Sequence, residues 1–233
     1  MITLRPAAER GLSSLDWLKS FHTFSFAEYV DRRHMGFRSL RVINDDTVDG
    51  GAGFRPHSHR DMEIVTYVVD GALRHEDSLG NKFTMGKDEV QRMTAGTGIT
   101  HSEMNDAYDT PVHFLQIWIL PAQGGLAPGY EQKAFAAADK DGKLKLIVSP
   151  DGRDGSLRIH QDTRIYASRL GAGQTLPVTL APRRSAWVQV VSGGLSLNGR
   201  ALSAGDGAAV EGETSLTFAG RDGTAEFLLF DLA

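Results

Sequence analysis

Short runs of β-branched and aromatic residues, each ended by a turn, constrain this chain more than any other feature of its sequence. The clearest runs are residues 64–69, 113–120, 187–191 and 227–230. Asp70-Gly71 ends the first run as a turn, and Pro121 stops the second because proline has no N–H to donate to a sheet. Many short strands with regular turns are typical of a barrel or a sandwich. We therefore predict an all-β chain, whose best helix candidate is short, around residues 14–19.

The order of these elements occurs twice along the chain. Residues 68–73 (Val-Val-Asp-Gly-Ala-Leu) resemble residues 190–195 (Val-Val-Ser-Gly-Gly-Leu), and in both halves a hairpin turn and then a glycine turn follow. Repetition of this kind indicates two copies of one β-module. Residues 121–142, rich in Gly, Ala and Pro, are typical of a linker. In a chain of 233 residues we predict two β-barrel domains, 1–125 and 126–233.

Composition excludes several classes of function. The net charge is −4 and the longest basic run is Arg183-Arg184, which argues against a direct nucleic-acid footprint. The absence of cysteine excludes disulfides, thiolate metal ligands and cysteine nucleophiles. No apolar stretch approaches the roughly 18 residues that a membrane helix needs, and the first residues are charged where a signal peptide is apolar. A cytoplasmic protein without a membrane partner is the expectation.

Two pairs of potential metal ligands stand out: His57 with His59, and His101 with Glu103. Residues two apart leave the same face of a strand, about 6–7 Å apart at Cα. If the two segments are neighbouring strands, three imidazoles and one carboxylate converge. Nitrogen and oxygen ligands without sulfur suit Fe, Mn, Co, Ni, Cu or Zn. Such a set leaves one or two coordination positions open, which is typical of a reactive rather than a structural site.

These residues lie within two motifs that resemble those of the cupin superfamily. The first is Gly51-x5-His57-x-His59-x3-Glu63 followed by Gly71, and the second is Gly96-x-Gly98-x2-His101-x3-Asn105. The spacing from Glu63 to Gly71 is one residue longer than usual, and Thr94 replaces the usual proline. More specifically, the chain resembles the pirin family over nearly its whole length. The segments that carry this resemblance begin at Trp17, Phe37, Pro56, His75, Thr94, Tyr130, Ser149 and His160.

The resemblance implies a bicupin whose N-terminal barrel alone binds metal. Aligning the two halves on their glycine turns places Thr179, Ala181, Gly220 and Asp222 where the first half has its potential ligands. Ordinary cupins use the carboxylate corresponding to Glu63, whereas pirins resemble a variant that uses Glu103. Geometry also favours Glu103, because six residues from His57 to Glu63 span roughly 20 Å of strand. Glu63 then remains as a possible hydrogen-bond partner of a ligand imidazole.

By the same resemblance, the chain is expected to be a metal-dependent dioxygenase that cleaves flavonols such as quercetin with release of carbon monoxide. His57, His59, His101 and Glu103 would be the metal ligands, and Glu103 would also accept the proton of the substrate enol. The expected cofactor is one divalent cation, Fe(II) first, with Ni, Mn, Cu, Co or Zn as alternatives. The second hypothesis is a metal- or redox-sensing protein that regulates a transcription factor or metabolic enzyme as its protein partner. A monomer is the default expectation.

The remaining histidines receive simpler interpretations. His22 and His34 are interpreted as surface or locally hydrogen-bonded residues, and His75 as part of a surface ladder of ion pairs. His113 shares a strand face with apolar residues and is interpreted as a core histidine, while His160 has no evident partner. Gln116 and Trp118 share the opposite face from His113, where they either line the barrel mouth or pack in the core.

Overall fold

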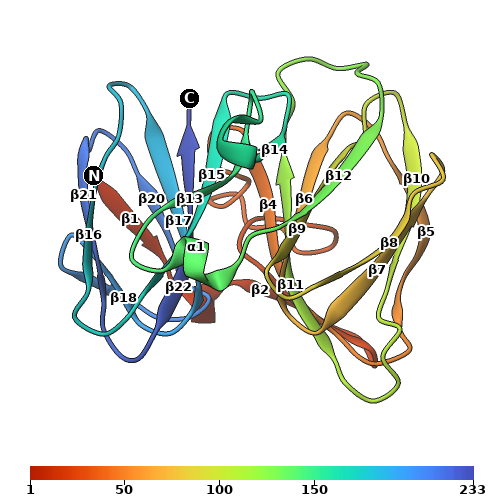
Figure 1. Ribbon diagram of the computed structural model, residues 1–233, viewed down its shortest axis with the longest axis horizontal. Helices are drawn as coiled ribbons and strands as arrows, with labels where there is room; N and C mark the ends of the chain where they lie inside the picture. Colours follow the sequence, from red (N-terminus) through yellow and green to blue (C-terminus); the bar gives the residue numbers. More distant parts are fainter. The chain divides into compact units, whose positions relative to one another are not determined.

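The computed structural model describes residues 1–233, and nearly all of its regular structure is β-strand (Figure 1). The prediction of an all-β chain is therefore confirmed. The chain divides into two compact units. The first unit comprises Gly11–Ala134 with Leu157–Gln161, and the second comprises Met1–Arg10, Phe135–Ser156 and Asp162–Ala233. The predicted domain boundary thus differs from this division at the N-terminus, because residues 1–10 lie in the second unit.

The first unit is built from two antiparallel sheets. The larger has the strand order β12-β9-β6-β11-β4-β3-β2, and the smaller has the order β5-β10-β7-β8 (Figure 1). The strands are β2 (Gly11–Ser14), β3 (Leu18–His22), β4 (Leu40–Val48), β5 (Gly53–His59), β6 (Glu63–Asp70), β7 (Ala72–Asp77), β8 (Lys82–Gly86), β9 (Glu89–Thr94), β10 (Ile99–Met104), β11 (Val112–Ile119), β12 (Gly129–Ala134) and β14 (Leu157–Arg158).

The second unit repeats this arrangement. Its larger sheet runs β1-β20-β17-β22-β15-β13 and its smaller sheet β16-β21-β18-β19. Its elements are β1 (Ile2–Arg5), η1 (Ala7–Glu9), α1 (Ala137–Lys140), β13 (Lys145–Ser149), η2 (Arg153–Gly155), β15 (Thr163–Leu170), β16 (Thr175–Thr179), β17 (Ser185–Ser192), β18 (Leu195–Leu197), β19 (Arg200–Leu202), β20 (Gly207–Val210), β21 (Ser215–Gly220) and β22 (Ala225–Leu232).

The strand orders of the two units correspond element by element. The order β9-β6-β11-β4 of the first unit matches β20-β17-β22-β15 of the second, and β5-β10-β7-β8 matches β16-β21-β18-β19. The predicted internal repeat is therefore confirmed. The repeated segment around Gly71 and Gly193 is in each case the turn between two strands, where both glycines have positive φ values of 79° and 71°.

The helix predicted around residues 14–19 is wrong. Leu15 and Leu18 exchange two backbone hydrogen bonds, so these residues form the turn of a hairpin between β2 and β3. β3 then pairs with β4, with Leu18 opposite Val48. Burial of Leu18 and strand pairing with β4 override a weak local preference for helix.

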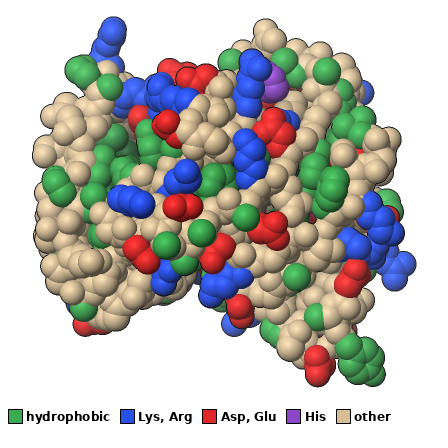
Figure 2. All heavy atoms as spheres, in the orientation of Figure 1, with side chains coloured by type: hydrophobic (Ala, Val, Ile, Leu, Met, Phe, Trp, Pro, Cys, Tyr) green, Lys and Arg blue, Asp and Glu red, His purple; other side chains and the backbone are tan.

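The interiors of the two units differ in polarity. The second unit encloses an apolar core that contains Phe218 and Phe227, stacked with ring centroids 4.7 Å apart. The first unit encloses an apolar cluster around Val68, Leu73 and Phe114, but many of its inward positions are polar. On the face shown in Figure 2, basic and acidic side chains are interspersed. No helix of the structure has the length and hydrophobicity to span a membrane.

Candidate metal centre

The first unit brings the two predicted ligand pairs together on adjacent strands. β5 and β10 are antiparallel, with His101 opposite His57 and Ile99 opposite His59. The next pair along the two strands is Glu103 with Phe54, so from the His57–His101 pair β5 advances three residues while β10 advances two. The extra residue is a β-bulge at Arg55-Pro56, where proline cannot donate a ladder hydrogen bond. As a result, Phe54, His57 and His59 all line the same cavity.

Two glycines that flank the ligand segments are required by close backbone contacts. A Cβ at Gly53 would lie 2.3 Å from the carbonyl oxygen of Glu103, so only glycine allows β5 to approach β10 at this point. Gly96 has a φ of 48°, and a Cβ there would lie 2.0 Å from the carbonyl oxygen of Leu126. The turns predicted from the sequence therefore position the strands that carry the histidines.

His57, His59 and His101 form a compact cluster. One nitrogen from each ring lies within 4.8 Å of the corresponding atoms of the other two. The ring centroids are 4.5 Å apart for His57 and His101 and 4.9 Å apart for His59 and His101. His101 is 2% exposed, whereas His57 and His59 are partly exposed toward the cavity.

Hydrogen bonds leave a free nitrogen on at least two of these rings. Nδ1 of His57 lies 2.8 Å from the carbonyl oxygen of Arg55 and must donate to it, which leaves Nε2 as the nitrogen available to a metal. Nε2 of His101 is buried without any hydrogen-bond partner. Burial, followed by the neighbouring His57, lowers the pKa of His59 to about 4, and burial likewise lowers the pKa of His101. Neutral imidazoles with free lone pairs are the form that binds a metal.

Behind His101 lies a chain of two further buried groups. Nδ1 of His75 is 3.5 Å from Nδ1 of His101, and Nε2 of His75 is 3.0 Å from the carboxylate of Asp77. Burial raises the pKa of Asp77, but hydrogen bonds from His75, Asn81 and Leu79 outweigh this effect and hold it below its usual value. The ionised Asp77 accepts the Nε2 proton of His75, so Nδ1 of His75 can accept a hydrogen bond from Nδ1 of His101. Nε2 of His101 is then left free to face the cluster. The interpretation of His75 as a surface residue is wrong, because it is 0% exposed.

Glu103 is buried and held by side-chain donors. Gln116 donates to its Oε2 over 2.7 Å, and Gln91 donates to its Oε1 over 2.9 Å. Its carboxylate forms a second close group with His101 and His75, within 4.8 Å, rather than with the whole cluster of His57, His59 and His101. Burial, followed by the charge of Asp46, raises the pKa of Glu103 to about 7 despite these hydrogen bonds.

The donors to Glu103 belong to a row of polar side chains that crosses five strands of the larger sheet, here called the polar row. Strand pairing places its members side by side: Gln91, Thr66, Gln116, Asn44 and His22, on β9, β6, β11, β4 and β3. All five are 8% exposed or less. Of the two interpretations of His22, surface or locally hydrogen-bonded, the surface one is wrong, because His22 is buried and contacts Asn44 and Ser13 over 2.8 Å each.

Glu63 points to different partners. Thr94 donates to its Oε2 over 2.8 Å, and Nδ1 of His160 lies 2.9 Å from its Oε1. None of its recorded hydrogen bonds goes to an imidazole of the cluster. The interpretation of His160 as a residue without a partner is wrong, since the segment Leu157–Gln161 packs in the first unit. The threonine that replaces the usual proline of the motif is the residue that fixes Glu63.

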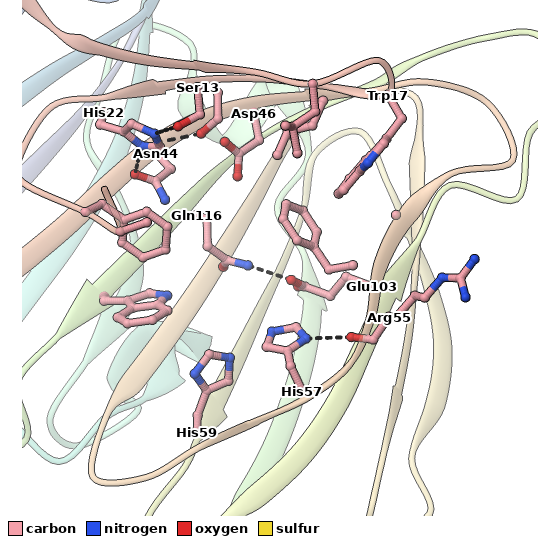
Figure 3. Close-up of a pocket in the computed structure, with 18 residues that line it drawn as sticks. Ser13, Trp17, His22, Asn44, Asp46, Arg55, His57, His59, Glu103 and Gln116 are labelled. Carbon is pink, nitrogen blue, oxygen red and sulfur yellow. Dashed lines mark hydrogen bonds between the residues drawn. The ribbon is translucent and has the colours of Figure 1, made fainter. Parts of the chain in front are cut away.

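A cavity of about 720 Å³ opens beside the cluster (Figure 3). Its apolar wall includes Leu15, Trp17, Phe26, Phe54 and Trp118, and its polar wall includes Ser13, Ser20, His22, Asn44, Asp46, His57, His59, Glu103 and Gln116. A volume in this range is typical of small-molecule sites. Gln116 and Trp118 therefore line the barrel cavity, which is one of the two positions expected for them.

Two further histidines, His34 and His113, lie away from the cluster and the cavity. His113 is 34% exposed in its side chain and lies 2.6 Å from Asp45, so its interpretation as a core residue is wrong. His34 forms a local hydrogen bond with Asp31 over 2.9 Å, as expected.

The donor set fits a divalent metal ion. Three clustered imidazoles and a nearby carboxylate provide nitrogen and oxygen ligands, and the buried Nε2 of His101 is a potential ligand atom that no group of the protein satisfies. In the second unit, the first pair of β16 and β21 joins Thr179 to Ser215. When this pair is aligned with His59–Ile99 of the first unit, the positions of the four ligands are occupied by Pro177, Thr179, Thr217 and Ala219. These positions lie two or three residues before those expected from the sequence alignment. These positions contain neither histidine nor carboxylate.

Two cupin-type barrels, one with a histidine cluster facing an apolar cavity, define a class of metal-binding bicupin proteins. Residues 4–119 match the family model described as Pirin, and residues 146–232 match the model described as quercetinase C-terminal cupin domain. The chain belongs to the pirin family.

Individual relatives match over the full length. The chain is 47% identical to a quercetin 2,3-dioxygenase of Escherichia coli (strain K12), covering 100% of this chain and 99% of the relative. It is 40% identical to a pirin-like protein of Caulobacter vibrioides, covering 100% of both. The crystal structure of the bacterial pirin YhhW from Escherichia coli in complex with nickel(II) superposes with a TM-score of 0.95, at 46% identity, covering 100% of this chain and 99% of that one.

Proposed function

We propose that this protein is a metal-dependent dioxygenase that opens the central ring of flavonols such as quercetin and releases carbon monoxide. The observation that carries the proposal is the cluster of three imidazoles, two of which line a largely apolar cavity of about 720 Å³. A relative 47% identical over the whole chain is named quercetin 2,3-dioxygenase.

The proposed metal ligands are His57, His59, His101 and Glu103. For the cation we propose Fe(II), with Ni, Mn, Cu, Co and Zn as alternatives; the relative YhhW forms a complex with nickel(II). When bound, a divalent cation acts as a Lewis acid that makes an enolic hydroxyl more acidic. The protein supplies the site geometry, because the Asp77–His75 chain and the carbonyl group of Arg55 fix the orientation of two imidazoles.

Glu103 is proposed to accept the proton of the flavonol enol. Burial raises the pKa of Glu103, whereas a bound cation would lower it, so the carboxylate would be ionised and able to accept a proton once the metal is in place. Gln91 and Gln116 hold the carboxylate in place, so it need not reorganise when its charge changes.

The cavity walls would hold a flat aromatic substrate and exclude water. Trp118 packs edge-on against His59, with ring centroids 5.1 Å apart, and Phe26 packs against Trp118 at 5.3 Å. Aromatic side chains in such edge-to-face arrangements form rigid walls. A planar substrate between them would present its enol to Glu103 and the histidines.

The activity is tested by mixing the metal-loaded protein with quercetin under nitrogen and then admitting oxygen. We expect consumption of quercetin together with carbon monoxide in the headspace. Metal-loaded protein that binds quercetin but produces neither ring-opened product nor carbon monoxide would refute the proposed reaction.

The ligand set is tested by comparing Glu103→Gln with Glu63→Gln, two isosteric changes at buried glutamates of the same unit. Elemental analysis of the purified proteins should show loss of metal in Glu103→Gln and wild-type metal content in Glu63→Gln. Retained metal in the first variant and loss in the second would reverse the assignment.

A further inference from the structure

Asp46, on the cavity wall formed by β3 and β4, is not explained by the proposed metal ligands or by the donors to Glu103. Its side chain is 2% exposed, and its Oδ1 is buried without a hydrogen-bond partner. Ser20, directly opposite on β3, provides a hydrogen bond to the carboxyl group. An unpaired buried polar atom destabilises the folded state, so native proteins retain few of them.

Strand alternation directs Asp46 into the cavity. Asn44 and Asp46 are two residues apart on β4, so they share the inward face, and both line the cavity. The intervening Asp45 faces the other way and has its own partner, His113, at 2.6 Å. Asp45 therefore has a hydrogen-bond partner outside the cavity, whereas Asp46 lies on the cavity side with one acceptor atom unpaired.

The other polar groups around Asp46 are satisfied by one another. His22 contacts both Ser13 and Asn44 over 2.8 Å, which occupies both of its ring nitrogens. In the view of Figure 3, Asp46 lies with Ser13, His22 and Asn44 on one side, and His57 and His59 lie on the opposite side, with Gln116 and Glu103 between them. On this side the unpaired acceptor is Oδ1 of Asp46, which lies just beneath the cavity surface, so a ligand hydroxyl that reaches from the histidines would meet it after a small rotation of the carboxyl group.

We propose that Asp46 forms a second polar subsite, which accepts a hydrogen bond from a substrate hydroxyl group remote from the enol. The preferred substrates are then flat aromatic enols that carry a further phenolic hydroxyl, rather than aromatic enols in general. The proposal rests on the proposed function for the placement of the enol at the histidines. A substrate without the remote hydroxyl leaves Oδ1 buried and unpaired, and sites built for a hydrogen bond discriminate strongly against such analogues.

The test measures binding to the protein as isolated, under nitrogen, so that no turnover occurs. Quenching of tryptophan fluorescence gives Kd for quercetin, which has phenolic hydroxyls on both outer rings, and for 3-hydroxyflavone, which has no hydroxyl besides the enol. One hydrogen bond to a buried carboxyl predicts a preference for quercetin of about tenfold. Asp46→Ala should raise the Kd of quercetin by about tenfold and leave that of 3-hydroxyflavone unchanged.

Two further variants separate recognition from folding. Asp46→Asn keeps the shape and one carbonyl acceptor, so its preference for quercetin should lie between those of wild type and Asp46→Ala. Asp45→Asn changes the adjacent carboxylate on the outer face and should keep the full preference. Equal preferences in all four proteins, or equal weakening of both ligands in Asp46→Ala, would overturn the subsite.

The outcome is independent of the proposed reaction. Absence of carbon monoxide together with a preference that depends on Asp46 would refute the dioxygenase but support the subsite. Ring cleavage of quercetin and 3-hydroxyflavone with equal Kd values would refute the subsite but support the dioxygenase.

Discussion

Replacing Asp46 by asparagine should change how the stability of the protein depends on pH. Burial raises the pKa of Asp46 to about 7 from 3.8, with a further contribution from Asp45 and an opposing hydrogen bond from Ser20. Between these two values the folded protein holds a proton that the unfolded chain has lost. The free energy of unfolding therefore falls as pH rises through this window, and the fall ends above the folded-state pKa.

The magnitude follows from the width of the window. Each pH unit in which the folded state binds one extra proton costs about 1.4 kcal/mol, and pH 5 to 7 lies within the window. From pH 5 to pH 8 the wild-type protein should therefore lose about 3 kcal/mol more stability than Asp46→Asn does. That is a large part of the ~5–15 kcal/mol by which folded domains are usually stable.

Urea unfolding at pH 5 and pH 8, in the presence of a chelator, measures this difference without a contribution from bound metal. Asp109→Asn, at an exposed loop position, removes one carboxyl group without touching the cavity and is the matched control. A difference between wild type and Asp46→Asn that is the same at both pH values would refute the reasoning. If Asp46→Asn loses more stability than wild type between pH 5 and pH 8, the predicted effect has the wrong sign.

Three further predictions concern the supporting structure. Asp77→Asn removes the acceptor that fixes His75, and metal affinity measured by competition with a chelator should fall about 10–100-fold while the fold is retained; unchanged affinity would contradict the orienting role of the chain. Gly53→Ala places a methyl group 2.3 Å from the carbonyl oxygen of Glu103, so both the melting temperature and the metal content should fall, and wild-type values of both would show that β5 can shift freely. Phe227→Ala removes a stacked core ring from the second unit and should cost about 3–5 kcal/mol in denaturant unfolding; a cost below about 1 kcal/mol would contradict the assignment of this ring to the core.

The strands and the repeat could be predicted because their signals are local. Runs such as 64–69 alternate or bury both faces, and Gly71 and Gly193 end equivalent strands in both units. The i, i+2 spacing of the histidines indicated a shared strand face, and the structure places His57 directly opposite His101.

What the sequence did not reveal depends on contacts between distant residues. The segment around residues 14–19 pairs with β4, about 30 residues away, and this pairing decides its conformation. Glu63 and its hydrogen-bond partner His160 are 97 positions apart in the sequence. The position of His75 was available from alternation, since Leu73, His75 and Asp77 share a face that is largely buried, but its charged neighbours suggested a surface strand.

The polar row was also accessible in principle but was not recognised. Thr66, Gln116 and Asn44 stand at inward positions of strands that are otherwise apolar, where a barrel with only a structural role would have aliphatic side chains. Polar residues at alternate positions of adjacent core strands are the signal, and it becomes visible only once the strand register is known.

The first strand of the chain completes the second barrel, not the first. β1 pairs with β20, so Ile2 lies opposite Val210. During synthesis the residues of β1 are made long before those of their partner strand. Closing so long a loop costs conformational entropy and delays folding. The barrel with the histidine cluster is built mainly from one continuous segment, whereas the second barrel can pair its edge strand β1 only after β20 has been made.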